Sequence, residues 1–488
     1  MQPIRNQYVF SRNGLNISLP EGWKIRGIAG YLLAVAPDLP LHTYQGEQVS
    51  YFLIGLAFHI EYPSLNEKEI LNRFPEEFNA FLNAIDFLSG NFVIIRKAKD
   101  SVEILNDNSA SLKAFYLLDN TGFVDAVASD PALLKELYTL EEDNSPEAQY
   151  FYNSSFFKKN QIRLGDRTQF RNVFQVLPNH FLDIASAKSI RFFPREKKEE
   201  SSLNESIDKT NYYLTSVIDA ASRRYNLKCG LTAGWDSRMV LAATKHKKHE
   251  VLYYTFYSSN KMEQNKDIEI ARKIAETLNL HYKLIDTNFQ QENSQNQDLY
   301  QNYCLMHPHK PRLIANGFSQ FDNKNDLALL GVISEIAKNY YESVVVKDGE
   351  TLTKASHFEL CDYVINYQQK KYEELKPLCD KYGYNLKDIA HWEQDIANFA
   401  AQGIQYNSFA LRTFSPFNSR EIIKTILATP RKYRDKHCHK FYSNYLKKYW
   451  PELLDFPVNP TLKMKMIVFT KKVKLYDIYK VLLNNVIK

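Results

Sequence analysis

The sequence predicts a mixed fold of two domains, an N-terminal α+β domain followed by an α/β domain with a parallel sheet. The chain has 488 residues, which is too long for one ordinary hydrophobic core. A charged stretch without an apolar period, residues 195–202, separates two regions whose hydrophobic periods differ. We therefore place a domain boundary there, with domains at residues 1–194 and 201–488.

Before the boundary, short runs rich in β-branched and aromatic residues are separated by turn residues. One helical stretch, residues 67–87, interrupts them, and Pro75 is expected to begin its second half. This combination predicts an α+β domain. The strands are expected at residues 28–35, 51–59, 91–97, 102–105, 114–118 and 123–128.

After the boundary, the pattern alternates between the period of a helix and that of a buried strand. Such alternation predicts a parallel sheet covered by helices, and ligands of these sheets bind beyond the carboxyl ends of the strands. The turn at residues 232–237 follows the first strand, so it lies where a ligand is expected. From residue 352 the pattern is mostly helical. The expected elements are helix 203–221, strand 228–231, helix 237–244, strand 251–256, helix 267–278 and strand 281–285.

Composition argues against several classes of protein. Hydrophobic residues make up 44% of the chain, and no apolar run approaches the roughly 20 residues that span a bilayer. The five cysteines form no CxxC pair, which argues against a disulfide framework or a structural zinc site. The net charge of +6 is small, and the lysine-rich end, residues 463–488, is interpreted as a solvated helix face. Without a visible secretory signal, we expect a cytoplasmic protein with no nucleic-acid partner.

Residues 231–238, Leu-Thr-Ala-Gly-Trp-Asp-Ser-Arg, carry the clearest functional pattern. Thr232, Ala233 and Gly234 have little or no side chain, so successive backbone N–H groups can close around phosphate oxygens. The helix expected near Ser237 adds the positive end of its dipole. The alternative is an ordinary strand-to-helix turn in which Ser237 caps the helix.

The loop resembles the Ser-Gly-Gly-x-Asp-Ser pyrophosphate loop of the asparagine synthetase family, with Thr232 in place of the Ser and Ala233 in place of the first Gly. Residues 164–170, 415–420 and 427–434 are similar to further segments of that family and occur in the same order. The resemblance implies a glutaminase-like Ntn-hydrolase domain of αββα architecture. It also implies an ATP-pyrophosphatase domain with a parallel sheet of the adenine-nucleotide α-hydrolase type and a helical C-terminal part.

The glutaminase motif of the family departs from its pattern here. That motif is Cys-Gly-Ile-x-Gly, in which the cysteine is the nucleophile and its free α-amino group is the base. The corresponding residues 26–30 are Arg-Gly-Ile-Ala-Gly, and no cysteine precedes Cys229. A guanidinium cannot attack a carboxamide, and an internal residue has no free amine. We therefore expect no glutaminase activity, as in the β-lactam synthetase relatives, and a first domain kept as scaffold.

A second phosphate-side element is expected at residues 331–341, which resemble the family's Gly-Glu-Gly-x-Asp-Glu stretch that ends in Tyr. Gly331 and Glu335 match this stretch, whereas Val332 and Ile333 replace an acid and a glycine. The resemblance therefore implies a phosphate site with fewer acids than the family pattern supplies.

The resemblance implies the residues of the site and the cofactors ATP and Mg²⁺. The catalytic set is Asp236, Glu335, Lys338 and Lys440. The set expected to bind ATP is Leu231, Thr232, Ala233, Gly234, Asp236, Ser237, Arg238, Phe256 and Gly331. Mg²⁺ is expected on Asp236 and Glu335, because magnesium that bridges phosphates needs carboxylate or water oxygens. The structural alternatives are a surface acid for Glu335, a surface pair for Lys338 and a structural ion pair for Arg238.

These features predict an AMP-forming, ATP-dependent amide ligase that adenylates a small-molecule carboxylate for attack by ammonia or an amine. Changes at Ala233, Val332 and Ile333 leave a second hypothesis open, a catalytically degenerate member of the family that binds a nucleotide or a partner protein. A pyrophosphatase acting on nucleic acid is disfavoured, because the chain has no basic arm with interleaved aromatics and no catalytic cysteine pair. A homodimer is left open.

Overall fold

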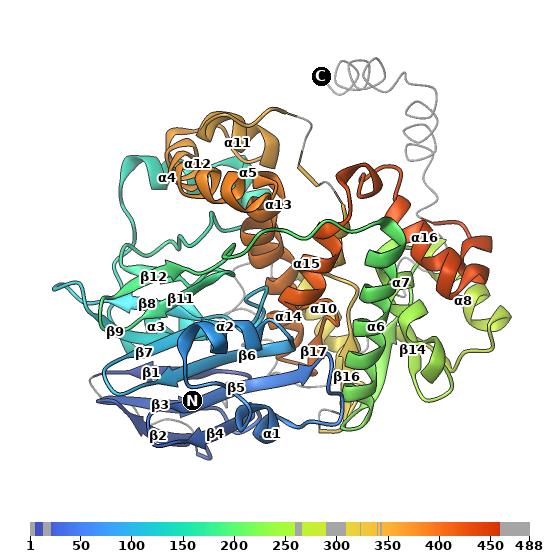
Figure 1. Ribbon diagram of the computed structural model, residues 1–488, viewed down its shortest axis with the longest axis horizontal. Coiled ribbons are helices and arrows are strands. Elements are labelled where there is room, and N and C mark those ends of the chain that lie inside the picture. Colours follow the sequence, from blue (N-terminus) through green and yellow to red (C-terminus); the bar gives the residue numbers. More distant parts are fainter. Residues whose placement is uncertain are drawn as a thin grey trace.

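The computed structural model of the protein describes residues 5–12, 21–258, 266–288, 309–322, 324–338, 340–341 and 344–458. Within these residues, two antiparallel sheets pack face to face in the N-terminal half, and a parallel sheet with covering helices follows. Figure 1 shows the blue strands of the first half beside the green helices α6 and α7 of the second. The predicted combination of an α+β and an α/β part is confirmed. The lysine-rich segment 463–488 lies outside the described residues.

The first sheet has the strand order β10-β8-β9-β1-β3-β2. The strand predicted at residues 28–35 is in fact the end of β2, a turn and β3. Ala29 and Gly30 both have positive φ, 50° and 83°, which is the conformation of a two-residue hairpin turn matched to the twist of the strands. The strands are β1 (Tyr8–Ser11), β2 (Lys24–Ile28), β3 (Tyr31–Val35), β8 (Phe115–Leu118), β9 (Val124–Ala128) and β10 (Val173–Gln175).

The second sheet has the order β12-β11-β7-β6-β5-β4 and packs on the first. Alternate residues of the two sheets meet in one apolar core, for example Phe10 and Leu33 with Ile54 and Ile95. The strands are β4 (Leu41–Gln45), β5 (Ser50–His59), β6 (Leu88–Lys97), β7 (Val102–Asn106), β11 (His180–Asp183) and β12 (Lys188–Arg191).

Helices cover the outer faces of both sheets. α1 (Glu67–Leu71) and α2 (Phe78–Ile85) lie on the second sheet, and α3 (Pro131–Leu137) lies on the first. This succession of layers is the αββα architecture that was expected. Pro75 does not begin the second half of the 67–87 stretch, because the chain is non-helical there and α2 starts only after Glu77, whose carboxylate caps it.

The parallel sheet has the order β15-β14-β13-β16-β17. The chain adds β14 and β15 on one side of β13, and then returns to add β16 and β17 on the other. The carboxyl ends of β13 and β16 therefore flank the point where the strand order reverses, which is where open α/β sheets bind ligands. The strands are β13 (Asn226–Gly230), β14 (Leu252–Tyr257), β15 (Tyr282–Asp286), β16 (Asp326–Leu329) and β17 (Thr413–Phe414).

Helices surround this sheet and extend over the sandwich. The helical character predicted beyond residue 352 is confirmed for the described residues. Around the sheet lie α6 (Leu203–Ser222), α7 (Trp235–Ala243), α8 (Lys266–Thr277), α10 (His309–Phe318), α14 (Ala401–Asn407), α15 (Arg420–Ala428) and α16 (Lys440–Tyr449). At the top of Figure 1 lie α4 (Pro146–Asn153), α5 (Ser155–Asn160), α11 (Gly349–Ser356), α12 (Asp362–Tyr382) and α13 (Leu386–His391). No helix in the described part of the chain is long and apolar enough to cross a membrane.

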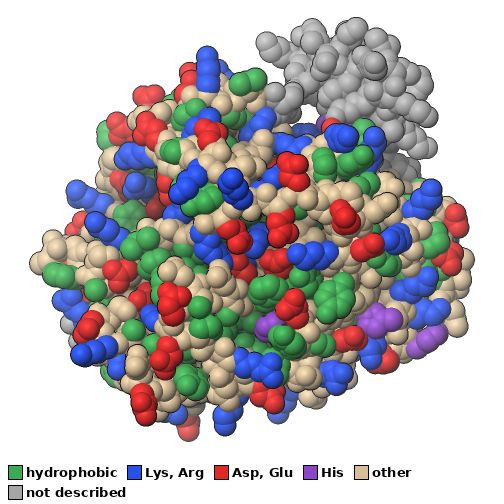
Figure 2. Space-filling view, in the orientation of Figure 1, with side chains coloured by type: hydrophobic (Ala, Val, Ile, Leu, Met, Phe, Trp, Pro, Cys, Tyr) green, Lys and Arg blue, Asp and Glu red, His purple; other side chains and the backbone are tan. Residues whose placement is uncertain are grey.

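Charged side chains are mixed on the face of the molecule shown in Figure 2. Lys and Arg side chains are interspersed with Asp and Glu over both the sandwich and the helices. A nucleic-acid footprint would gather the basic side chains into a patch or stripe. The described residues on this face form no such stripe.

Buried charges join the two halves of the chain. Glu393, in the π-helix Trp392–Ala400, is fully buried. Its carboxylate accepts hydrogen bonds from Arg191 Nη2 at 2.8 Å, Lys371 Nζ at 2.7 Å and Asn179 Nδ2 at 3.0 Å. Burial alone would raise the pKa of Glu393, but the neighbouring cations lower it to about 2. Arg191 and Asn179 belong to the first half, so the carboxylate of Glu393 links the two halves. The domain boundary near residue 195 stays a prediction.

Replacement of Glu393 by Ala is expected to lower the free energy of unfolding by about 3–5 kcal/mol, because it leaves Arg191 and Lys371 buried without a counter-charge. The matched control is Glu350→Ala, which breaks an exposed pair with Lys354 and is expected to cost less than about 1 kcal/mol. Urea unfolding followed by circular dichroism measures both. Equal losses in the two variants would contradict a structural role for the buried charges.

Candidate functional site

The loop after β13 is fixed by β14 before it enters α7. The N–H of Leu231 donates to Tyr254 O at 2.8 Å, and Leu231 O accepts from Thr255 Oγ1 at 2.6 Å. Gly234 is the N-cap of α7, with φ −79° and ψ 156°, and it has no side chain with which to cap the helix. The first N–H groups of α7 are therefore left to other acceptors, which is the condition for anion binding at a helix N-terminus.

The backbone of this loop already faces an anionic oxygen. The N–H of Ala233 donates to Asp267 Oδ1, in the first turn of α8, at 3.1 Å. The N–H of Gly234 donates to Thr232 Oγ1 at 3.1 Å, and that hydroxyl lies 2.7 Å from Ser237 Oγ. A carboxylate oxygen is chemically close to a phosphate oxygen, so the loop has the polarity of an anion-binding turn. The predicted loop residues are thus brought together.

Asp236, in the first turn of α7, has both carboxylate oxygens engaged. Oδ1 lies 2.6 Å from the hydroxyl of Ser334, 2.9 Å from that of Tyr442 and 2.9 Å from Lys338 Nζ, and Oδ2 lies 2.8 Å from the same ammonium. Burial alone would raise the pKa of Asp236, but Lys338 and the hydrogen bonds lower it below its ordinary value. The structure therefore joins the predicted residues Asp236 and Lys338.

Gly331 brings the loop after β16 into direct contact with α7. A Cβ atom at Gly331 would lie 2.7 Å from Asp236 C and 2.9 Å from Ser237 N, so a side chain has no room there. Ile333 follows with φ 74°, a left-handed conformation that is strained for a β-branched residue, and it is fully buried. The turn is thus held in a conformation that its own residues do not favour.

Glu335 lies in the 3₁₀ turn Ser334–Ala337 and is half-buried. Its Oε2 atom is buried and has no hydrogen-bond partner among the described residues. Burial raises the pKa of Glu335, and the negative charge of Asp236 raises it further. A purely structural buried acid is normally hydrogen-bonded, so this oxygen is available to a ligand or a proton.

The described residues do not fit the Mg²⁺ site that the resemblance implies. Both oxygens of Asp236 contact the ammonium of Lys338, and a metal ion on either oxygen would face that positive charge. Glu335 keeps one unpartnered oxygen. Among the residues that the structure describes, no group of three His, Cys, Asp or Glu side chains could hold a metal ion.

Two residues of the site were missed by the sequence analysis. The hydroxyl of Tyr442, on α16, lies 2.9 Å from Asp236 Oδ1 and 2.6 Å from Ser334 O. His439 is 8% exposed, and both of its ring nitrogens lack a partner among the described residues. Its ring centroid lies 5.4 Å from that of Trp235. Burial, then Lys338, lowers the pKa of His439 to about 4, so the imidazole is neutral near pH 7.

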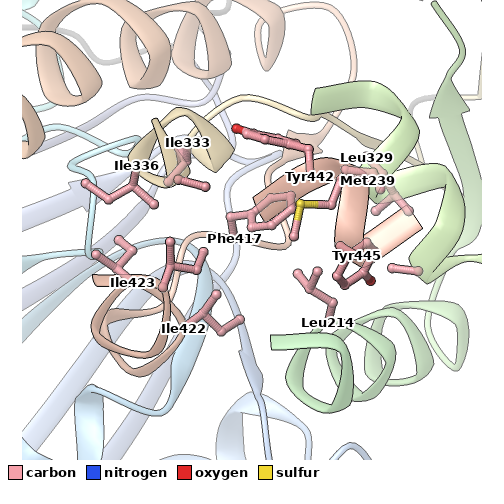
Figure 3. Packing of buried hydrophobic residues seen from close by; sticks show 14 of the residues in the cluster. Leu214, Met239, Leu329, Ile333, Ile336, Phe417, Ile422, Ile423, Tyr442 and Tyr445 are labelled. Atoms are coloured by element: carbon pink, nitrogen blue, oxygen red, sulfur yellow. The ribbon is translucent and has the colours of Figure 1, made fainter. Parts of the chain in front are cut away.

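An apolar cluster packs between the elements that carry the residues of the site. Figure 3 shows Leu329, Ile333 and Met239 packed around Phe417 and Tyr442. These residues come from β16, the turn after it, α7, the segment before α15 and α16, respectively. The site is therefore carried by elements that share one core, which limits their movement relative to each other.

Three predicted residues are placed away from the loop amides. Arg238 is fully buried, and its guanidinium donates three hydrogen bonds to backbone carbonyls of residues 453–457, so its contacts are structural but are not the ion pair that was the alternative. Phe256, near the end of β14, packs edge-on against Phe318 of α10 with ring centroids 5.0 Å apart. Lys440 is exposed at the start of α16, and its ammonium forms no ion pair with the described residues.

The residue that takes the place of the glutaminase nucleophile is also defined. Arg26 lies in β2, the edge strand of the first sheet, and is exposed. Its guanidinium donates to the neighbouring Ile25 O at 3.0 Å. The absence of glutaminase activity stays a prediction from residue chemistry.

Comparison with known proteins finds no matching family model and no matching curated protein. Among solved structures, the chain is similar to an NH3-dependent NAD synthetase from Campylobacter jejuni, with 16% identity over 41% of this chain and 96% of that chain and a TM-score of 0.24. It is also similar to an NMN synthetase from Francisella tularensis (13%, 42% and 97%, TM-score 0.22). A glutamine phosphoribosylpyrophosphate amidotransferase from B. subtilis has 13% identity over 64% of this chain and 63% of that chain, with a TM-score of 0.22. Likenesses this weak carry no argument about function, which has to be inferred from the site itself.

Gly331→Ala is expected to lower the free energy of unfolding by about 1–3 kcal/mol, because the added methyl forces two backbone segments apart. Gly403→Ala is the control: no atom lies within 4 Å of a Cβ there, and the position is inside α14, so a gain of about 0.5–1 kcal/mol is expected. Urea unfolding of both variants distinguishes a close approach from a general intolerance of alanine. A loss at Gly403 as large as that at Gly331 would contradict the expectation.

The lowered pKa of His439 makes the free energy of unfolding depend on pH. Its folded pKa of about 4 lies below the ordinary value of 6.5, so between these values the unfolded chain binds a proton that the folded protein does not. The free energy of unfolding is therefore expected to fall as the pH falls through this window, by up to about 1.4 kcal/mol per pH unit from this group. His439→Phe removes the group, and its stability should fall less steeply. Urea unfolding across the window measures this, and identical slopes would exclude the assignment.

Proposed function

We propose that this chain is an ATP-dependent, AMP-forming carbon–nitrogen ligase of the asparagine synthetase type, without glutaminase activity. The observation that carries the proposal is the meeting of two loops where the strand order of the parallel sheet reverses, one presenting backbone N–H groups and the other Lys338. The proposal assigns residues 201–488 to the synthetase domain, residues 1–194 to a scaffold domain, and the activity to the cytoplasm.

The proposed reaction has two displacements. An oxygen of the substrate carboxylate attacks the α-phosphorus of ATP, a P–O bond to the carboxylate forms, and the bond to the β-phosphate oxygen breaks as pyrophosphate leaves. Ammonia or an amine then attacks the acyl carbon, the amide bond forms, AMP leaves and the nitrogen loses a proton. Both steps need positioning and charge stabilisation more than covalent help from the protein.

The residues of the site take roles that follow from their contacts. The N–H groups around Ala233 and the start of α7 would hold the phosphates once Asp267 gives way. Lys338 stabilises the charge of the leaving pyrophosphate, and Asp236 positions it. Glu335 is suited to accept the proton of the attacking nitrogen, because its raised pKa brings it closer to the working pH and its Oε2 is unpartnered.

The roles proposed for the remaining predicted residues rest on their positions alone. Phe256 lies at the carboxyl end of β14, the strand next to the loop, where the adenine is proposed to lie. Lys440 is exposed and lies two residues before Tyr442. We propose for it only that its ammonium neutralises negative charge on the bound ligand. No step is assigned to Mg²⁺, because Asp236 is occupied by Lys338.

A second candidate function is a catalytically degenerate protein that binds a nucleotide or a partner. The engagement of the loop N–H of Ala233 by Asp267 favours it, since this carboxylate competes with phosphate for the same donor. The two functions differ in whether ATP is turned over.

The test incubates the full-length protein with ATP and pooled carboxylic acids and amines, and resolves AMP, ADP and pyrophosphate. AMP and pyrophosphate in equal amounts are expected. Asp236→Ala should lower the rate by about 100-fold or more, because Lys338 loses its anchor and a displacement of about 1 Å can cost that much. Asp208→Ala, which breaks an exposed pair with Lys448, is the control and should leave the rate unchanged. Production of ADP would exclude adenylation, and no turnover with any pool would favour the degenerate protein.

A further inference from the structure

The loop after β13 carries negative charges that oppose the binding of phosphate. Two carboxylates, Asp236 and Asp267, lie at the loop to which we assign phosphate binding. Carboxylates at this range repel phosphate unless a cation lies between them. Both oxygens of Asp236 already contact the ammonium of Lys338, so Lys338 is the candidate for that cation.

Lys338 lies where a cation on Asp236 would bind. Its Nζ is 2.9 Å from Oδ1 and 2.8 Å from Oδ2, and its side chain is 14% exposed. Nζ also lies 5.2 Å from the centre of the Tyr442 ring, and the backbone N–H of Lys338 donates to Glu335 O at 2.9 Å. The ammonium is therefore held by a carboxylate, an aromatic face and its own backbone turn.

Polar groups at the same place are left for a ligand. A lysine ammonium has three N–H donors, and the contacts with Asp236 use two of them. The third meets no acceptor among the described residues. His439 likewise leaves both ring nitrogens unpartnered although it is 8% exposed, and it lies beside Trp235, the first residue of α7. The ring nitrogens of His439 thus lack partners among the described residues next to the N-terminus of α7, and Lys338 keeps one donor that its contacts with Asp236 do not use.

A divalent ion and Lys338 exclude each other at Asp236. Magnesium binds oxygen at about 2.1 Å, so an ion on either oxygen would lie within about 5 Å of Nζ. Two like charges that close in a partly buried site repel strongly. The pair of Asp236 and Lys338, by contrast, has no net charge, so it does not oppose the attraction of an anion by the positive end of α7.

We propose that Lys338 replaces the divalent cation at Asp236, so that this loop binds the phosphate groups of its nucleotide without a divalent metal ion. The inference rests on the proposed function, because it takes the ligand of the loop to be a nucleotide phosphate.

Calorimetric titration of ATP into the full-length protein, once with EDTA and once with Mg²⁺, tests the proposal. For the natural protein, the two dissociation constants are expected to agree within about threefold. Lys338→Met is expected to weaken binding in EDTA by about tenfold or more, and Mg²⁺ should restore most of it because Asp236 is then exposed. Lys354→Met, which removes a lysine from an exposed pair on α11, is the control and should bind as the natural protein does in both buffers.

A double variant keeps the test decisive if Lys338→Met does not fold. Asp236→Asn with Lys338→Met removes both charges, so it leaves no unpaired carboxylate and is expected to bind ATP in EDTA with no further gain from Mg²⁺. Binding by the natural protein that requires Mg²⁺ would overturn the inference and leave the proposed function standing. Binding in neither buffer would overturn both. Metal-free binding that neither variant alters would also overturn the assignment of the cation to Lys338.

Discussion

The direct approach of two backbone segments at the carboxyl edge of the parallel sheet is the constraint on which the site depends. Gly331 lies so close to Asp236 and Ser237 that no side chain fits between them. The chain after β16 therefore runs over the first turn of α7, and this places Ser334 and Lys338 within hydrogen-bonding distance of Asp236. The contacts of Asp236 with Ser334 and Lys338 are consequences of that packing, since a wider separation would leave the carboxylate only the hydroxyl of Tyr442 as a partner.

The N-terminal half contributes to this arrangement through buried polar contacts. Asn418 donates to Asp107 Oδ1 at 2.8 Å, and Arg420 donates to Asp86 Oδ1 at 2.8 Å. Both donors lie next to Phe417, whose ring supports the site. Removal of the first half would take away these acceptors and expose to water the part of the apolar core that Leu56, Phe58 and Ile60 now share with Phe417, which is costly. These contacts are consistent with the scaffold role that we propose for the first half.

The parts of the site that could be predicted from the sequence are those carried by local patterns. The loop after β13 has a run of small residues, and Lys338 follows a strand of the same sheet, so their meeting was foreseeable from topology. Arg238 could also have been left out of the set expected to bind ATP. Residues two apart on a helix do not share a face, and Asp236 faces the loop after β16. Tyr442 had no local signal: it lies 206 positions from Asp236 and is one of 32 tyrosines. The hairpin at Ala29 was missed because alanine rarely adopts positive φ.

The loop after β16 combines a strained backbone with the cation that pairs with Asp236. Ile333 stands where the family pattern has glycine, yet it keeps a left-handed backbone at φ 74° and is fully buried. That conformation costs a β-branched residue about 1–2 kcal/mol, and a turn without a function would be free to relax. The same turn is followed by Lys338, whose ammonium pairs with Asp236, the residue on which the resemblance implies a metal ion. A strained turn that carries the partner of Asp236 is compatible with the anion site that we propose.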